Sequence, residues 1–415
     1  MPHRESGMTA PPACLARRLE YAFSRPLPVM SLPQPSSDAL AHSTRLVNLL
    51  TESIRAAGGW IPFSRYMELA LYAPGLGYYS GGARKFGPGG DFITAPELTP
   101  LFGQALAAQV EQVMRLAAPH VLEAGAGTGL LAADLLLELE RRGALPERYD
   151  ILELSGELRE RQFDTLAQKV PHLAGRVRWL DALPESFAGV VVANEVLDVM
   201  PVHLVVSRPD GLFERGVALD ASGSLRWADS PASGAVAEAA VALGLPLPEQ
   251  GEYVTEVNLA ARAWVAAWAS RLAAGALLLV DYGYPRAEYY LPSRSSGTLL
   301  CYYRHHAHGD PFLWPGLNDI TAFVDFTAVA EAAFEAGLDV LGYANQAAFL
   351  FNCGVLECLA RRGPEESADY IRAARAVQRL TTPQEMGELF KVLALGKGLT
   401  EPLLGFMRGD RLHTL

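Results

Sequence analysis

The sequence contains little cysteine. Its 415 residues include only Cys14, Cys301, Cys353 and Cys358, and no two of these have the CxxC spacing. This scarcity excludes a disulfide framework and a zinc ribbon, and it is typical of a protein from a reducing compartment. Because Cys353 and Cys358 lie near apolar residues, we expect them to be buried free thiols.

The sequence also lacks a long apolar run and an excess of basic residues. No stretch approaches the roughly 18 apolar residues that a membrane-spanning helix needs. Lys and Arg number 35 against 46 Asp and Glu, which gives a net charge of −11 at pH 7 with neutral His. Because non-specific binding to nucleic acid requires clustered cations, we expect no nucleic-acid partner. These absences predict a soluble, cytoplasmic protein without a membrane span.

Half of the residues are hydrophobic and 20% are charged, a balance that supports a large core. The proline-rich residues 1–42 lack periodicity and predict a flexible tail. Its arginines give it some transit-peptide character, but Glu5 and Glu20 argue against mitochondrial targeting, and translation from Met30 is an alternative. We divide the remainder into a mainly helical front segment (43–114), the first part of a core (115–201), an inserted β meander (202–250), a return to the core (251–281), inserted loops (282–325) and a C-terminal part that completes the sheet (326–415).

Short β-branched or Leu-rich runs alternate with helical patterns from residue 120 onward. The first helix is clear at residues 130–140, where apolar side chains recur at helical spacing. Such alternation predicts βαβ units and a mostly parallel sheet. We therefore expect one doubly wound, seven-stranded, Rossmann-like α/β sheet with strands at 120–123, 149–154, 176–180, 189–193, 276–280, 338–343 and 390–394.

Two long insertions interrupt this alternation. Within 202–250, strand-like runs are separated by the turn signals Pro209-Asp-Gly and Ser222-Gly, which predict an antiparallel hairpin or meander. The insertion 282–325 is rich in Tyr, His, Pro and Gly, a composition typical of functional loops. The strand-like runs of the first insertion are 202–207, 212–219 and 224–227.

Three histidines of the second insertion, His305, His306 and His308, lie within four residues. No carboxylate or cysteine completes a familiar zinc spacing with them. We predict that they line a cleft or are exposed, and that the protein has no metal site.

The segment 121–129 reads as a strand, an acidic residue, three alternating glycines and then a helix. Gly125, Gly127 and Gly129 permit a tight turn and a close approach of the backbone to a ligand. The dinucleotide fingerprint is GxGxxG, whereas this loop is GxGxG with Glu123 two residues before its first glycine. A carboxylate there would repel a pyrophosphate but suits a cation, so we predict that the loop binds S-adenosylmethionine.

The next two strands also end in acidic residues. Glu153 lies where an acidic side chain accepts hydrogen bonds from both ribose hydroxyls. Asp181, followed by Ala182, is placed to accept the adenine amino group. Since the carboxyl ends of parallel strands meet at one edge of a sheet, we expect these residues and Glu123 to share the cofactor site.

After the fourth strand comes the sequence Asn194-Glu-Val-Leu-Asp198. A methyl acceptor must be held in line with the sulfonium methyl, and paired carboxylates would align and stabilise a guanidinium. We predict Glu195 and Asp198 as this pair, with Asn194 as a third catalytic residue. The alternative is that Asp198 or Asn194 caps a following helix.

Several segments together resemble the MidA-like S-adenosylmethionine-dependent methyltransferases, which are related to a mitochondrial complex I assembly methyltransferase. The resemblance extends from about residue 45 to residue 397. The residues that carry it are Tyr66-Met-Glu-Leu-Ala-Leu-Tyr-Ala-Pro-Gly-Leu-Gly-Tyr-Tyr79, Gly90-Asp-Phe-Ile-Thr-Ala-Pro-Glu97, Leu101-Phe-Gly103, the glycine loop, Asn194-Glu-Val-Leu-Asp198, Asp281-Tyr-Gly283, Asp319-Ile-Thr-Ala-Phe-Val-Asp-Phe326 and Phe390-Lys-Val-Leu393.

The resemblance implies a class I methyltransferase fold and a front segment that covers the cofactor with Asp91, Thr94 and Pro96. It also implies an arginine side chain of a protein as acceptor, since mitochondrial members are linked to complex I assembly through symmetric dimethylation of an arginine on a subunit. Two positions depart from the family pattern: Ala126 replaces a proline in the glycine loop, and Phe323 stands where the family usually has histidine. If that histidine touches the acceptor, acceptor chemistry could differ here.

We therefore expect a protein arginine methyltransferase that uses S-adenosylmethionine, whose substrate could be a respiratory complex I subunit. Two alternatives remain open at this point: an assembly factor that binds the cofactor without catalysis, and a small-molecule methyltransferase. The sequence says nothing about the oligomeric state.

Overall fold

The computed structural model describes residues 32–81 and 94–415 of the chain. Most of the predicted tail lies outside these residues, but its last part was predicted wrongly, because a helix begins at Ser37. Ser36 caps this helix, and Leu46, Leu50 and Ile54 recur at helical spacing on its fully buried face. The helices are α2 (Ser37–Ala56), α3 (Phe63–Tyr72), α4 (Ala95–Leu98), α5 (Leu101–Leu116), α6 (Leu130–Arg141), α7 (Gly156–Lys169), α8 (Gly234–Leu243), α9 (Leu259–Ala269), α10 (Arg286–Tyr289), α11 (Phe326–Glu335), α12 (Gln346–Asn352), α13 (Val355–Ala360) and α14 (Ala368–Thr381).

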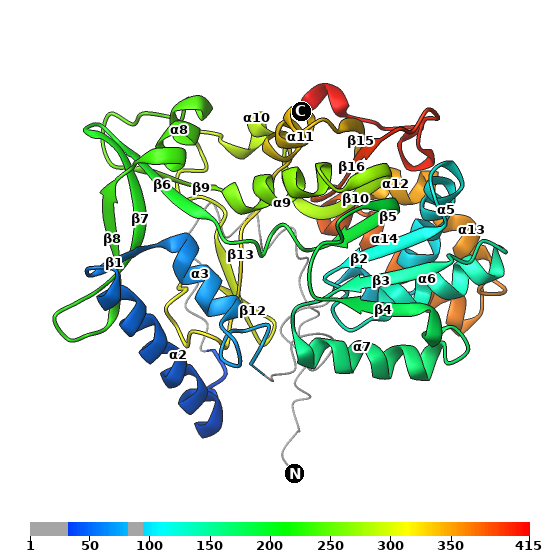
Figure 1. The fold of residues 1–415 in the computed structure, drawn as a ribbon, viewed down its shortest axis with the longest axis horizontal. Coiled ribbons are helices and arrows are strands. Elements are labelled where there is room, and N and C mark those ends of the chain that lie inside the picture. The colour runs from blue at the N-terminus through cyan, green and yellow to red at the C-terminus, as the bar shows by residue number, and fades with distance from the viewer. Residues whose placement is uncertain (1–31, 82–93) are drawn as a thin grey trace, which may run out of the picture.

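All seven predicted core strands form one sheet, which confirms the predicted fold class (Figure 1). The strand order is β4-β3-β2-β5-β10-β16-β15; β16 runs antiparallel to both of its neighbours, and the other pairings along this path are parallel. A short eighth strand, β14 (Val324–Asp325), extends the pairing of β10. The seven are β2 (His120–Ala124), β3 (Arg148–Leu152), β4 (Val177–Leu180), β5 (Phe187–Asn194), β10 (Leu272–Tyr284), β15 (Asp339–Asn345) and β16 (Phe390–Lys397).

Helices cover both faces of this sheet, so its central strands are apolar on both sides. On β5, Val190 and Val192 pack into the core under α5 and α6, whereas Val191 and Ala193 pack into the core under α9 and α11. This alternation follows from the two-residue period of a strand. The apolar interior of the sheet thus leaves Glu123, Asn194 and Asp281 near the carboxyl ends of its central strands.

The first insertion forms the predicted meander as part of a larger antiparallel sheet, seen beside the main sheet in Figure 1. The three predicted strands, β6, β7 and β8, pair in sequence order. Two further strands join this sheet: β1, from the segment predicted to be helical (43–114), pairs with β7, and β9, from the range predicted as core (251–281), pairs with β6. Sequence periodicity missed β1 and β9 because each is short and pairs with a distant part of the chain. The strands are β1 (Trp60–Pro62), β6 (His203–Arg208), β7 (Gly211–Leu219), β8 (Leu225–Pro231) and β9 (Tyr253–Val257).

The second insertion contains a three-stranded antiparallel sheet of order β12-β11-β13. Its strands are β11 (Leu300–Tyr303), β12 (His306–His308) and β13 (Asp319–Thr321), and they lie near α3 of the front segment in Figure 1. Among the residues that the structure describes, no helix combines the length and apolar character that a membrane crossing requires. Cys353 and Cys358 are buried free thiols, as predicted.

Candidate functional site

A cavity of about 580 Å³ opens at the carboxyl ends of β2, β3, β5 and β10. The glycine loop between β2 and α6 forms one wall of it, through Gly125 and Gly127. Gly125, Gly127 and Gly129 have φ values of +65°, +53° and +81°, so this turn requires glycine at all three positions. Gly129 is the first residue before α6 and lies behind the cavity wall, where an added Cβ would come 3.1 Å from Gln162 Cα.

Two of the three predicted strand-end acids line the cavity. Glu123 is 2% exposed and accepts a hydrogen bond from the Tyr149 hydroxyl at 2.5 Å; burial raises the pKa of Glu123 to about 7. Glu153 accepts the Ser155 backbone N–H at 2.9 Å and the Gln162 amide at 3.0 Å, and burial raises its pKa as well. Both carboxylates are therefore held in fixed positions, and burial disfavours their charged forms. A bound cation or hydrogen-bond donor would stabilise those charged forms.

The third predicted acid, Asp181, is not brought to the cavity. Its side chain is 90% exposed and forms an ion pair with Arg159 at 2.7 Å, and Ala182 beside it is also exposed. The Arg159 guanidinium is also anchored by the backbone carbonyls of Glu153 and Leu180, so the partner of Asp181 is held at the strand ends. Asp181 does follow directly after its strand, as the sequence predicts. Its side chain, however, is exposed and does not line the cavity.

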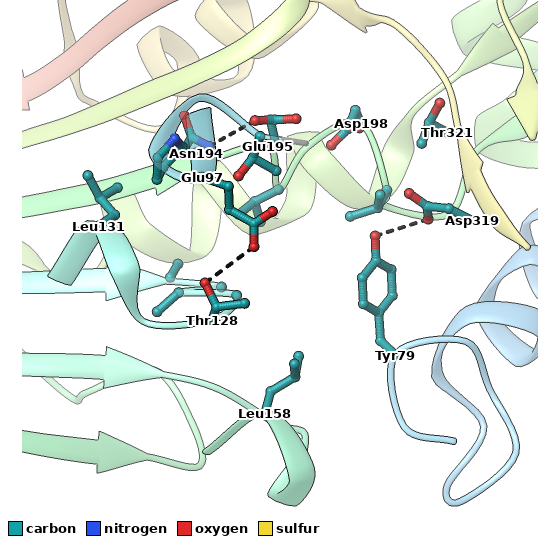
Figure 2. Close-up of a pocket in the computed structure, with 18 of the residues that line it drawn as sticks. Tyr79, Glu97, Thr128, Leu131, Leu158, Asn194, Glu195, Asp198, Asp319 and Thr321 are labelled. Carbon is teal, nitrogen blue, oxygen red and sulfur yellow. Dashed lines mark hydrogen bonds between the residues drawn. The ribbon is translucent and has the colours of Figure 1, made fainter. Parts of the chain in front are cut away.

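The segment before α5 covers the glycine loop. Thr94 and Pro96, which the resemblance implies as cofactor contacts, line the cavity, whereas Asp91 lies outside the described residues. Glu97, which the sequence analysis did not single out, accepts a hydrogen bond from Thr128 of the loop at 3.4 Å (Figure 2). This contact ties the covering segment to the glycine loop.

Asn194, Glu195 and Asp198 all line the cavity at the end of β5. No helix follows them, which removes the capping alternative. The Asn194 amide donates to Glu195 at 3.1 Å, and Glu195 has a φ of +55°, uncommon for a residue with a side chain. Asp198 is 3% exposed and accepts a hydrogen bond from the Tyr282 hydroxyl, while its Oδ1 atom is buried without a hydrogen-bond partner. An unpaired buried carboxylate oxygen on a cavity wall is suited to a ligand donor.

The loop that carries Asp198 is held by a residue from the neighbouring strand. Asp281 of β10 is 1% exposed and accepts the backbone N–H groups of Leu197 and Asp198, at 2.9 and 3.2 Å. Asp281 belongs to a segment of the resemblance but was not predicted as a site residue. The feature of the sequence that could have identified Asp281 as a site residue is its place as an acidic residue near the end of an apolar strand.

Three carboxyl groups are therefore crowded together: Asp198 and Asp281 are buried, and Glu195 is half-buried. Burial, followed by the charge of Asp198, raises the pKa of Glu195 to about 8. Burial raises the pKa of Asp198 to about 6, although the hydrogen bond from Tyr282 lowers it. Burial and the charges of Asp198 and Glu195 hold the pKa of Asp281 well above its usual range. A bound cation would relieve this repulsion and favour the ionised forms.

Aromatic side chains and another carboxylate complete the cavity, which Figure 2 shows in part. Tyr72 and Tyr79 stack with ring centroids 5.6 Å apart, and the Tyr79 hydroxyl donates to Asp319 at 3.0 Å. Tyr302 of β11 lines the cavity beside them. The run from Tyr302 to His308 was predicted to line a cleft or to be exposed, whereas Tyr72, Tyr79 and Asp319 were not predicted as site residues, because the chain brings them together from segments more than 200 residues apart.

Phe323, the departure from the family pattern, is 3% exposed and does not line this cavity. Its ring instead packs edge-on against that of Tyr282, at 5.2 Å between centroids. In this chain, Phe323 therefore packs against Tyr282, the tyrosine that donates to Asp198. Phe323 itself does not line the cavity in which an acceptor would bind.

The three histidines lie on the hairpin formed by β11 and β12. His305 lines the cavity from a turn with a φ of +63°, while His306 and His308 are engaged with Arg304 O and Asn318. Within residues 32–81 and 94–415, no three candidate ligands come together in a way that could hold a metal ion.

Known proteins are similar to this chain over most of its length. A model of a family of S-adenosyl-L-methionine-dependent methyltransferases, Methyltransf_28, matches residues 101–344. Protein arginine methyltransferase NDUFAF7, mitochondrial, from Mus musculus is 32% identical over 386 residues, which cover 85% of this chain and 84% of the relative. The chain belongs to this family of S-adenosylmethionine-dependent methyltransferases. The Drosophila melanogaster NDUFAF7 homolog, also named a mitochondrial protein arginine methyltransferase, is 29% identical and covers 91% of this chain and 92% of its own length.

A solved structure supports the cofactor of this methyltransferase. A COG1565 superfamily member from Burkholderia thailandensis, crystallised with S-adenosyl-homocysteine, is 53% identical, with a TM-score of 0.89 over 93% of this chain and 100% of that chain. S-adenosyl-homocysteine is what remains of S-adenosylmethionine after methyl transfer. The cavity of this methyltransferase fits the cofactor, because the glycine loop admits close backbone approach and the acidic wall suits a cationic ligand without phosphates.

Proposed function

We propose that this methyltransferase transfers a methyl group to a guanidinium nitrogen of an arginine in a protein. The observation that carries the proposal is the carboxyl pair of the half-buried Glu195 and the buried Asp198, which line a cavity with an acidic wall. Among the described residues, Arg379 is the one Lys or Arg side chain on that wall, and it is 3.3 Å from Glu385. The relatives named as protein arginine methyltransferases support the same acceptor.

The proposal gives each side of the cavity a separate task. Bound S-adenosylmethionine supplies a methyl group on a positively charged sulfur, ready for attack by a nucleophile. Gly125 and Gly127 let the backbone lie against the cofactor, Glu153 accepts its ribose hydroxyls, and Glu123 faces its cationic part. Thr94 and Pro96 cover it from the front segment.

Glu195 and Asp198 would hold the acceptor, with Asn194 fixing Glu195 through its amide. A guanidinium paired with two carboxylates is restricted to one plane and one direction, so its attacking nitrogen is oriented toward the methyl group. As the new N–C bond forms and the S–C bond breaks, the methylated nitrogen loses a proton. A carboxylate with a raised pKa, such as Glu195, is a suitable acceptor for that proton.

Affinity for a cationic acceptor should rise with pH. The carboxyls of Asp198 and Glu195 have pKa values raised to about 6 and about 8, so both are more protonated at pH 6 than at pH 8.5. Only the ionised forms attract a guanidinium, which itself stays charged over this range. For the protein loaded with S-adenosyl-homocysteine, calorimetry with Nα-acetyl-arginine methylamide should give binding about tenfold tighter at pH 8.5 than at pH 6.

The control for this profile is Glu195→Gln, which retains the Asn194 hydrogen bond but cannot ionise. Its affinity should rise less steeply with pH than that of the intact protein, because Glu195 no longer titrates whereas Asp198 and Asp281 still do. Asp281 of β10, Glu97 of α4 and Tyr302 of β11 also face the cluster and are unchanged in this variant. An affinity in the intact protein that is independent of pH would contradict the proposed role of the two carboxylates.

The reaction itself is tested by methyl transfer from S-adenosylmethionine carrying a radiolabelled methyl group. The purified protein is incubated with an extract of cells that lack it, and protein and small molecules are separated before acid hydrolysis. We expect the label in methylated arginine from the protein fraction. Label confined to small molecules would contradict the arginine acceptor, and S-adenosyl-homocysteine binding without any transfer would contradict catalysis.

Two finer expectations remain predictions. The resemblance implies a respiratory complex I subunit as the substrate, which the labelled proteins of the same experiment would identify. The relatives are named as mitochondrial proteins, whereas the composition of this chain predicts a cytoplasmic location.

A further inference from the structure

The small sheet of the second insertion presents one face to the cavity. Ala307, Tyr302 and Asp319 are direct cross-strand partners on β12, β11 and β13, so their side chains lie on the same face. All three line the cavity, and so does Thr321, two residues further along β13. The neighbours that alternate with them, such as Cys301 and Ile320, face the core formed with α2 and α3. The insertion is therefore an ordered wall of the site.

Asp319 is the charged residue of this wall. It is 2% exposed, and its Oδ1 atom accepts the Tyr79 hydroxyl at 3.0 Å and the backbone N–H of Ile320 at 3.0 Å. The hydrogen bond from Tyr79 fixes the carboxylate, because the Tyr79 ring is itself stacked on Tyr72. Figure 2 shows Asp319 at the same cavity as Asp198 and Glu195, with Asp198 lying between the other two carboxylates in this view.

The electrostatic surroundings connect Asp319 with Asp198. Burial raises the pKa of Tyr302, and the charges of Asp319, Asp198 and Glu195 raise it further, in that order. Burial, and then the charges of Asp319 and Asp198, also raise the pKa of Tyr72. Tyr72 and Tyr302 thus lie within the field of both carboxylates, and both line the cavity, so a planar cation bound there could contact the rings and both carboxylates.

We propose that Asp319 is a third acceptor-binding carboxylate, which pairs with the guanidinium held by Glu195 and Asp198 while Tyr72 and Tyr302 flank its plane. This inference rests on the proposed function and extends it from the strand-end residues of the main sheet to the inserted sheet. A guanidinium has five N–H donors in a rigid fork, so it can pair with carboxylates at more than one edge. A lysine ammonium, a compact charge, would gain less from a third carboxylate in a fixed position.

The test is calorimetric titration of the full chain, loaded with S-adenosyl-homocysteine, with three probes at pH 8.5. These are Nα-acetyl-arginine methylamide and its lysine and citrulline counterparts. We expect the arginine probe to bind, the neutral citrulline probe to fail, and Asp319→Asn to weaken arginine binding at least about tenfold. Affinity for S-adenosyl-homocysteine should stay within about twofold in the variant, which also shows that the variant is folded.

The matched control is Asp325→Asn, which makes the same chemical change at another buried carboxylate. Asp325 does not line this cavity; it caps α11 by accepting the Ala328 N–H at 3.0 Å, and asparagine caps equally well. This variant should bind the arginine probe as the intact protein does.

The outcomes separate this inference from the proposed function. Arginine binding that is unchanged in Asp319→Asn would overturn the role of Asp319 and leave the function intact. Preference for the lysine probe over the arginine probe would overturn the arginine acceptor, whether or not Asp319 contributes. If Asp319→Asn does not fold, a crystal structure of the intact protein with S-adenosyl-homocysteine and the arginine probe decides: a guanidinium nitrogen within hydrogen-bond distance of Asp319 supports the inference, and its absence there overturns it.

Discussion

Replacing Asp198 with asparagine is expected to lower the rate of methyl transfer by about a thousandfold, while affinity for S-adenosyl-homocysteine stays within about twofold. Asp198 is buried and accepts the Tyr282 hydroxyl with one oxygen, which leaves Oδ1 for the acceptor. Asparagine keeps the shape and can still accept from Tyr282, but it has no negative charge. The attacking guanidinium would then lose a charged partner at a desolvated position, where such partners matter most.

The measurement is single-turnover transfer of labelled methyl groups to the protein fraction that serves as acceptor, with cofactor affinity determined separately by calorimetry. Asp325→Asn is again the matched control and should transfer at the normal rate. A normal rate in Asp198→Asn would remove Asp198 from the proposed pair. A variant that also loses the cofactor would show that Asp198 supports the cofactor side of the cavity and does not serve the acceptor alone.

The parts of the site that could be predicted from sequence lie on continuous strand-to-turn segments. Glu123, the three glycines and Glu153 follow directly from the end of a strand, and a strand that belongs to a parallel sheet delivers its last residues to one edge. The seven core strands were predictable for a related reason, since each is a short apolar run bounded by turns or helices. For these residues, the sequence pattern of strands and turns is enough to determine where they lie in the fold.

Other residues depend on contacts that local pattern does not contain. Asp281 acts on a loop more than 80 residues earlier in the chain, and Tyr79 donates to Asp319 across 240 residues. Asp181 shows the opposite failure: it follows its strand directly, but its exposed side chain pairs with Arg159 and does not line the cavity. Phe323 was noted only as a departure from the family pattern, and its packing against Tyr282 could not be predicted from the sequence.

Gly127→Val is expected to weaken S-adenosyl-homocysteine binding by more than about a hundredfold, to beyond the range of calorimetry at ordinary concentrations. The φ of Gly127 is +53°, a conformation in which a β-branched residue is strained, and relief of that strain would distort the loop. Gly127 also lines the cavity, so a valine side chain would occupy space on the cofactor wall. The Gly127 carbonyl accepts the Gln162 amide, which also binds Glu153, so a shifted loop would disturb the proposed ribose site as well.

Strain and steric exclusion can be separated with Gly143→Val as the matched control. Gly143 has a φ of +70°, is exposed, and has no atom within 4 Å of an added Cβ. Both substitutions should therefore cost about 1–2 kcal/mol of folding stability through backbone strain. Only Gly127→Val should lose the cofactor, and equal losses in the two variants would mean that global destabilisation, not the glycine loop, limits binding. Binding within threefold of normal in Gly127→Val would place the cofactor away from this loop, and the roles proposed for Glu123 and Glu153 would fail with it.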